Sequence, residues 1–163
     1  METLLKLALM VVGTVSAAQP GLAQTPKVGT FDRASIVVAF YGSPLWAAEL
    51  KAKQAEMQQA RQANDQKKID ELQRWGRDGQ ELAHKQLAGE AGIDNILEMM
   101  KPMLAAVAAQ AHVVSIAPEV PGADKTAATV DVTGLLLDRL QASAKTRQII
   151  EELRKSQKEG SPR

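Results

Sequence analysis

The sequence contains no cysteine, only two histidines and few aromatic residues, which make up 3% of the chain. The lack of cysteine excludes a disulfide framework, a thiol nucleophile and a zinc site built on thiolates. It also excludes a lipid anchor on a cysteine. Large aromatic side chains fill much of an ordinary globular core. Their scarcity predicts a thin core, as in a helical hairpin or a coiled coil.

An excess of either charge is also lacking, since 20 Lys and Arg stand against 19 Asp and Glu, for a formal net charge of +1. Nothing in the total charge therefore indicates a nucleic-acid partner. Along the middle of the chain, lysines such as Lys51 and Lys53 are interleaved with Glu49 and Glu56. This pattern is typical of a solvated helix face with ion pairs between neighbouring turns.

The first 23 residues have the layout of a secretory signal peptide. A short polar start leads into the apolar run LALMVVGTVSAA, and small residues follow. We expect cleavage after Ala23, with Ala18 as the alternative, so that the mature chain begins at Gln24. The apolar run is shorter than the roughly 20 residues that span a bilayer. No stable membrane span is therefore expected once residues 1–23 are removed.

Short β-prone segments frame a long helical stretch. The segments 27–32, 112–117 and 128–132 are rich in apolar and β-branched residues, which predicts strands. Residues 34–41 also have β propensity, but no turn residues separate them from the first strand, so we interpret them as a short helix packed on the sheet. Residues 44–111 form a helical, coiled-coil-like excursion. The predicted fold class is mostly α with a small β-sheet (α+β).

The helical excursion has a clear start and three candidate breaks. Ser43 can cap the first helix and Pro44 suits its first position. The breaks lie at Asn64-Asp65, at Gly76-Gly79 and at Gly89–Gly92. We favour three helices with turns at the first and third breaks; the alternative is a two-helix hairpin whose tip lies near residue 77.

Two details of the later helices are also predicted. Asp94 is expected to cap the third helix of the excursion, and Pro102 is expected to kink it. Met99, Met100 and Met103 cluster on this helix. Methionine recurs on surfaces that bind many partners, but ordinary core packing is the favoured interpretation of these three.

The first strand needs partners, because one short strand cannot fold alone. We expect it to pair with Val113–Ile116, and the segment 129–132 offers a second partner. Thr133 is a plausible cap for the closing helix GLLLDRLQ. The residues expected to share burial are Val28, Phe31, Val114, Ile116, Leu136, Leu137 and Leu140.

No residues form a recognisable catalytic, cofactor or metal site, which predicts a protein that is not an enzyme. His84 and His112 lie on different elements, and a zinc site needs three or four ligands. We expect an exposed His84 and a His112 at a strand edge. Asp32 ends the first strand without an obvious partner, which favours a turn or helix cap. The hydroxyls considered as nucleophiles are those of Ser35, Ser43, Ser115 and Ser143; none lies in a Gly-x-Ser-x-Gly motif.

The order of segments resembles the Skp/OmpH family of periplasmic chaperones. The resemblance rests on VGTFDRASIV, AHVVSIAPE and ATVDVTGLLLDRL and covers about residues 27–142. We therefore expect an OmpH-like domain at 24–142, followed at 143–163 by a charged helix, from 144 to 158, and a disordered tail. The resemblance implies a periplasmic homo-oligomer, a trimer rather than a dimer, whose helical arms hold unfolded outer-membrane or envelope proteins. The alternative is a structural or regulatory coiled-coil protein of the envelope that binds one specific partner.

Overall fold

The structure, a computed structural model, describes residues 27–119 and 128–160, with side chains through residue 157. The predicted signal peptide at 1–23 and the predicted start at Gln24 lie outside the described residues. Within them, the chain is mostly helical with one small sheet, which confirms the α+β class. The elements are β1 (Val28–Phe31), α1 (Arg33–Tyr41), α2 (Pro44–Gln62), α3 (Gln66–Ala88), α4 (Asp94–Ala111), β2 (Ser115–Pro118), β3 (Thr129–Asp131), α5 (Thr133–Arg139) and α6 (Ala144–Gly160).

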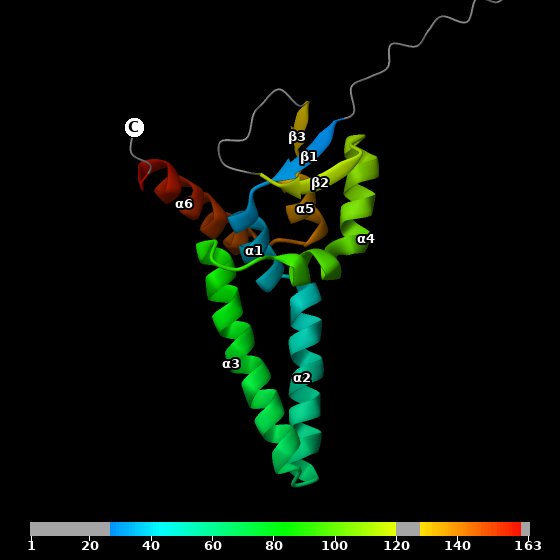
Figure 1. The fold of residues 1–163 in the computed structure, drawn as a ribbon, viewed down its shortest axis with the longest axis vertical. Coiled ribbons are helices and arrows are strands. Elements are labelled where there is room, and N and C mark those ends of the chain that lie inside the picture. Colours follow the sequence, from blue (N-terminus) through cyan, green and yellow to red (C-terminus); the bar gives the residue numbers. More distant parts are fainter. Residues whose placement is uncertain (1–26, 120–127, 161–163) are drawn as a thin grey trace, which may run out of the picture.

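Two parts can be distinguished in Figure 1: a body that contains the sheet, and a long hairpin of α2 and α3 that projects from it. The core of the body lies around α1, the helix predicted at 34–41. Asp32 caps this helix by accepting a hydrogen bond from the Ser35 backbone N–H at 2.7 Å. Buried side chains of α1, α4, α5 and α6 join Phe31 of the central strand in one cluster.

The sheet has the strand order β2-β1-β3, and both outer strands run parallel to β1. Val28 lies opposite Ser115 on one side and opposite Thr129 on the other. The predicted pairing of the first strand with both later segments is therefore confirmed. Gly29 lies at the crowded centre, where an added Cβ would come within 3.0 Å of the Ile116 side chain.

The second strand begins later than predicted. His112 adopts a left-handed conformation (φ 53°) and ends α4, so it is not a strand-edge residue. β2 then begins at Ser115 instead of residue 112. The expected burial of Val114 is wrong, because its side chain is 69% exposed, whereas Val113 is only 8% exposed. The turn out of α4 thus decides which of the two adjacent valines enters the core.

The helical excursion consists of the three favoured helices, α2, α3 and α4, of which the first two form the hairpin. Ser43 caps α2 through the Trp46 N–H at 3.3 Å, with Pro44 at the first position, as predicted. The turn follows at Asn64, and the Asp65 carboxylate caps α3. α3 ends at Gly89, whose left-handed conformation (φ 87°) suits a residue without a Cβ. Gly76 and Gly79 lie inside α3, so the hairpin with a tip near residue 77 is wrong.

The later helices differ from prediction at their starts. Asp94 is the first residue of α4, after Ile93 in the N-cap position, and the predicted side-chain cap is absent. Thr133 likewise is the first residue of α5; its N–H donates to the Asp131 carboxylate at 2.8 Å. Pro102 lies within α4, and the ribbon of α4 changes direction along its length in Figure 1. A proline inside a helix removes one backbone hydrogen bond, which explains such a bend.

The C-terminal helix packs on the body. α6 contacts α1 through the buried Ile150. It therefore packs on the domain, although the expected boundary between residues 142 and 143 places it outside. Arg154 of α6 donates to the Ser35 hydroxyl at 3.1 Å and lies 3.8 Å from the Asp32 carboxylate. α6 continues to Gly160, so the predicted disordered tail begins in a helix; residues 161–163 lie outside the described part.

Candidate functional site

The histidines considered as ligands do not meet. His84 is exposed on α3 and His112 is exposed at the end of α4. In the described ranges, 27–119 and 128–160, no group of three or more His, Cys, Asp or Glu could hold a metal ion. The described helices also include none that is long and apolar enough to cross a membrane.

The serines considered as nucleophiles have structural surroundings. Ser43 and Ser143 cap α2 and α6 through backbone N–H groups. Ser35 is buried and accepts a hydrogen bond from Arg154. Ser115 is exposed on β2. These contacts place the hydroxyls at helix ends, at a packed helix contact and on a strand surface.

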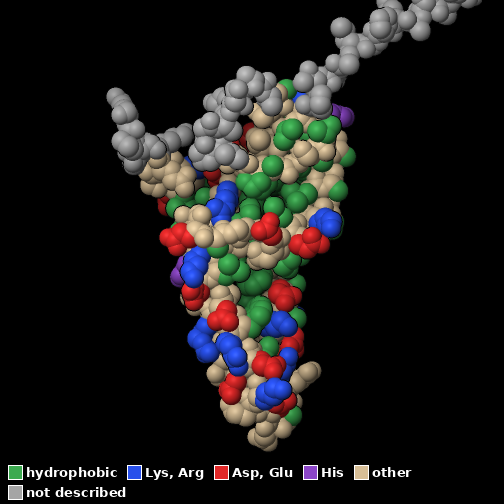
Figure 2. All heavy atoms as spheres, viewed as in Figure 1, with side chains coloured by type: hydrophobic (Ala, Val, Ile, Leu, Met, Phe, Trp, Pro, Cys, Tyr) green, Lys and Arg blue, Asp and Glu red, His purple; other side chains and the backbone are tan. Residues whose placement is uncertain are grey.

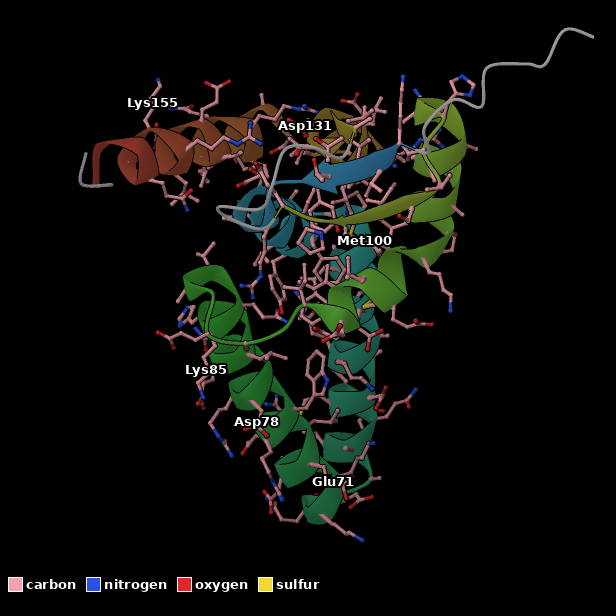
Figure 3. All side chains as sticks on the ribbon, turned by 45° about the horizontal axis from the view of Figure 1, so that its top comes forward. Glu71, Asp78, Lys85, Met100, Asp131 and Lys155 are labelled. Atoms are coloured by element: carbon pink, nitrogen blue, oxygen red, sulfur yellow. The ribbon has the colours of Figure 1, made fainter. Side chains whose placement is uncertain are left out.

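The methionines of α4 pack on the core, as expected. Met100 is fully buried in the middle of the body (Figure 3), and Met99 and Met103 pack against the core cluster. Met99 also lies beside Tyr41, Trp46 and Trp75, at the base of the hairpin.

Four of the five aromatic residues of the chain gather where the hairpin joins the body. Phe40 and Tyr41 end α1, and their rings lie 5.8 and 5.2 Å from the Trp46 ring of α2. Trp75 of α3 stacks on Trp46, with ring centroids 5.9 Å apart and an interplanar angle of 26°. Tyr41, Trp46 and Trp75 are all partly exposed. A chain poor in aromatics thus places three of them, Tyr41, Trp46 and Trp75, at a surface that solvent reaches, while Phe40 is buried beneath them.

Tyr41, Trp46 and Trp75 line an open groove between α2 and α3. Its upper compartment, of about 270 Å³, is bounded by Tyr41, Trp46, Leu50, Trp75, Gly76, Gly79, Gln80 and Ala83. Its lower compartment, of about 340 Å³, is bounded by Leu50, Lys53, Gln54, Met57, Gln58, Arg61, Leu72, Trp75 and Gly76. The compartments share Leu50, Trp75 and Gly76, so they form one groove along the hairpin. Figure 2 shows hydrophobic side chains along the middle of the hairpin between charged ones.

The two compartments are lined by cations and by no carboxylate, although Glu49 lines an adjoining pocket that shares Trp46 and Trp75 with the upper compartment. The segment 44–88 contains seven carboxylates, yet none of them lines either compartment. Lys53 donates to Glu56 at 2.8 Å, a hydrogen bond that lowers the pKa of the Glu56 carboxyl and keeps it ionised. Among the described residues, no carboxylate lies within ion-pair distance of Arg61. Within the described part of the chain, Arg61 is therefore a groove cation without an ion pair.

Two glycines keep the groove open. Gly76 and Gly79 lie inside α3 without a positive φ, and an added Cβ at either position would meet nothing within 4 Å. Neither backbone conformation nor packing therefore requires glycine, although each costs the helix about 1 kcal/mol relative to alanine. Larger side chains at these positions would project into the space beside Trp75. The glycines supply room in the groove at the expense of helix stability.

A buried amide fixes the hairpin to the body. Gln86 of α3 is 1% exposed and accepts a hydrogen bond from the Tyr41 hydroxyl at 2.8 Å. Its amide nitrogen donates to the Gly92 carbonyl at 2.7 Å and to the Asn95 side chain at 2.6 Å. Burial raises the pKa of Tyr41, so its hydroxyl remains a donor at neutral pH. The network joins α1, α3 and α4 directly above the groove.

The groove was not predicted from the sequence. From the sequence alone, Gly76 and Gly79 indicate a possible turn, and neither Trp46 nor Trp75 is assigned to a binding site. A usable signal was present: both tryptophans of a chain with 3% aromatics fall in the polar helical excursion. With the turn placed at Asn64-Asp65, they lie on facing helices.

Comparison of the chain with protein-family models, with curated proteins and with solved structures finds no match.

Proposed function

We propose that this protein is a non-enzymatic, exported chaperone that holds unfolded envelope proteins. The observation that carries the proposal is the open, aromatic-lined groove on a hairpin that projects from a packed body. Unfolded chains expose apolar segments, which a holdase must cover by burying apolar surface without chemistry or ATP. The partly exposed Leu50, Trp46 and Trp75 supply such surface.

The cell compartment in this proposal is the periplasm, reached through the signal peptide at residues 1–23. The layout of polar, apolar and small residues there supports export. The resemblance to the Skp/OmpH family supports the same compartment and the same class of client, an unfolded outer-membrane protein.

Homo-oligomerisation through the body is part of the proposal, with a trimer favoured. One face of the sheet packs on the core through Phe31, whereas Val28 and Thr30 on the other face are only half-buried. The neighbours that lie opposite Val28 and Thr30 in β2 and β3 are exposed: Ser115, Ala117, Thr129 and Asp131. Parallel sheets are usually covered on both faces. Among residues 27–119 and 128–160 no layer covers this face, and a second copy could supply one.

The holdase activity predicts that the mature protein suppresses aggregation of an unfolded outer-membrane β-barrel protein diluted from urea, without ATP. Light scattering is the measurement. Leu50→Glu places a charge in the groove and is expected to weaken suppression severalfold, because a charge opposes apolar burial.

Leu87→Glu is the matched control. Leu87 is 40% exposed on α3 and Leu50 is 37% exposed on α2, so the two changes replace leucines of similar exposure. Leu87 lies outside both groove compartments. Aggregation that proceeds unchanged with the wild-type protein would exclude the holdase and leave the coiled-coil alternative, in which one specific partner is bound. If Leu50→Glu and Leu87→Glu lose suppression of aggregation equally, the activity does not depend on the groove.

Protein isolated from its own cells is expected to consist of three chains that each begin at Gln24. Native mass spectrometry gives the number of chains, and the denatured mass gives the start of the chain. A chain that retains Met1 would contradict export. A species that stays monomeric at micromolar concentration would contradict assembly through the sheet.

A further inference from the structure

We infer that the hairpin groove selects extended peptide segments in which aromatic or large aliphatic side chains lie next to a carboxylate. This inference rests on the proposed function and specifies which client segments are bound at the groove. It is carried by the shape, the charge and the polar rim of the two compartments.

The apolar part of the ligand follows from the floor of the groove. Trp46 and Trp75 present partly exposed rings, and Leu50 continues the apolar surface toward Leu72 and Met57. Aromatic rings stack favourably on other rings and bury a large apolar area. The open space beside Gly76 and Gly79 admits a ring at the tryptophans.

The charge of the ligand follows from the cations of the lower compartment. Lys53 is already paired with Glu56, whereas Arg61 has no carboxylate partner among the described residues. Arginine binds carboxylates through two parallel hydrogen bonds. Acidic side chains of the hairpin lie elsewhere; Figure 3 shows Asp78 on the side of α3 that faces away from α2. A ligand carboxylate near Arg61 would meet no carboxylate among the residues that line the two compartments, since Glu56 is paired with Lys53 and Glu49 lines the adjoining pocket at the Trp46 end.

The rim favours a peptide over a lipid. Gln54, Gln58 and Gln80 border the groove with exposed amides, and each amide both donates and accepts hydrogen bonds. Such groups match the N–H and C=O groups of an extended backbone, whereas a hydrocarbon tail offers neither. From Trp46 to Arg61 the helix rises about 22 Å. An extended segment of about seven residues spans that length.

Intrinsic fluorescence reports on this site directly, because Trp46 and Trp75 are the only tryptophans of the chain. The probes are three blocked seven-residue peptides. The first contains two phenylalanines, a leucine and two aspartates that stand together at one end. The second has lysines in place of the aspartates, and the third has serines in place of the apolar residues. The acidic peptide is made in two versions, with the aspartates at the N-terminal or at the C-terminal end, since the direction of binding is not assumed. Palmitate serves as the lipid probe.

We expect the acidic aromatic peptide to bind about fivefold more tightly than the lysine peptide at low salt, and this ratio to narrow at high salt. The serine peptide should cause no change in fluorescence. Arg61→Gln should remove most of the preference for aspartate, whereas Arg74→Gln, a change of an exposed cation outside the groove, should preserve it.

Filling the groove gives a second test that does not depend on charge. Gly79→Leu should reduce binding of the acidic peptide at least tenfold while the thermal midpoint stays the same or rises, because leucine is the better helix former. Gln73→Leu, on an exposed face of the same helix, should leave binding unchanged. Loss of binding in a more stable protein cannot be attributed to unfolding.

Equal affinity for the lysine and aspartate peptides, or an unchanged preference in Arg61→Gln, would overturn the inference. Undiminished binding to Gly79→Leu would overturn it too, as would binding of palmitate in the absence of peptide binding. If no peptide binds but aggregation is still suppressed, the inference fails and the holdase proposal stands. If aggregation is not suppressed, the holdase proposal itself fails.

Discussion

Replacing Gln86 by leucine is expected to destabilise the protein by about 1–3 kcal/mol, although leucine is apolar and similar in size. The change removes the acceptor of the Tyr41 hydroxyl and the donor to the Gly92 carbonyl and the Asn95 side chain. Asn95 is exposed and Tyr41 is partly exposed, so both can turn toward water. The remaining cost comes from the loss of three hydrogen bonds made by a side chain that is only 1% exposed.

The loss should be concentrated at the junction of hairpin and body. Hydrogen exchange is expected to rise first in the last turns of α3 and in the loop that contains Gly92, because the network holds these segments against α1. Urea unfolding gives the total change. Tyr41→Phe removes one of the three hydrogen bonds and should cost less, about 0.5–1.5 kcal/mol.

Gln73→Leu is the matched control for this change, since Gln73 is exposed on the same helix. Its effect should stay within about 0.5 kcal/mol. If Gln86→Leu is as stable as this control, the buried network does not hold the hairpin in place. A groove whose upper end is fixed in this way offers its aromatic floor in one arrangement, which favours binding because less conformational entropy is lost.

Local chemistry made several features predictable from the sequence. Ser43 followed by Pro44 predicts a helix start, because the hydroxyl and the missing N–H both suit the first turn. Asp32 was expected at a turn or cap and does cap α1. The turn at Asn64-Asp65 was also favoured. In each case the residues that decide the outcome are adjacent in the chain, so no knowledge of tertiary packing is needed.

The groove depends on contacts that neighbouring residues do not determine. Trp46 and Trp75 are 29 positions apart, and their stacking requires the turn at Asn64 and the rotation of both helices about their axes. Gly76 and Gly79 are residues that often interrupt helices, yet α3 continues through them. Each glycine costs the helix only about 1 kcal/mol relative to alanine. Tertiary packing against α2 and α1 offsets that cost.

The faces of the sheet also depend on conformations that neighbouring residues do not determine. Val113 and Val114 are identical side chains in adjacent positions, and residues that differ by one position along a strand point to opposite faces. The pattern of the sequence favoured Val114 for the core. His112, with its φ of 53°, turns the chain as α4 ends, and Val113 enters the core instead. A single residue in the left-handed conformation therefore exchanges the assignment of the two valines, whereas Ile116, two positions after Val114, packs against the core as expected.

Val113→Asp is expected to abolish cooperative folding of the isolated protein, whereas Val114→Asp should change stability by no more than about 0.5 kcal/mol. The Val113 side chain is 8% exposed and lies against the centre of the sheet, where one methyl group is 3.2 Å from the position of a Cβ on Gly29. An unpaired carboxylate there costs several kcal/mol, comparable to the total stability of a small domain. Thermal unfolding by circular dichroism, at one concentration for both variants, is the measurement.

Val113→Ala adds no charge and is the control. It should retain a cooperative transition with a free energy of unfolding that is lower by about 1–3 kcal/mol, which keeps the test informative if Val113→Asp does not fold. Val114 is 69% exposed, so a carboxylate there remains in water. Equal destabilisation by the two aspartates, or a Val113→Asp variant that unfolds like the wild type, would contradict the placement of Val113 in the core.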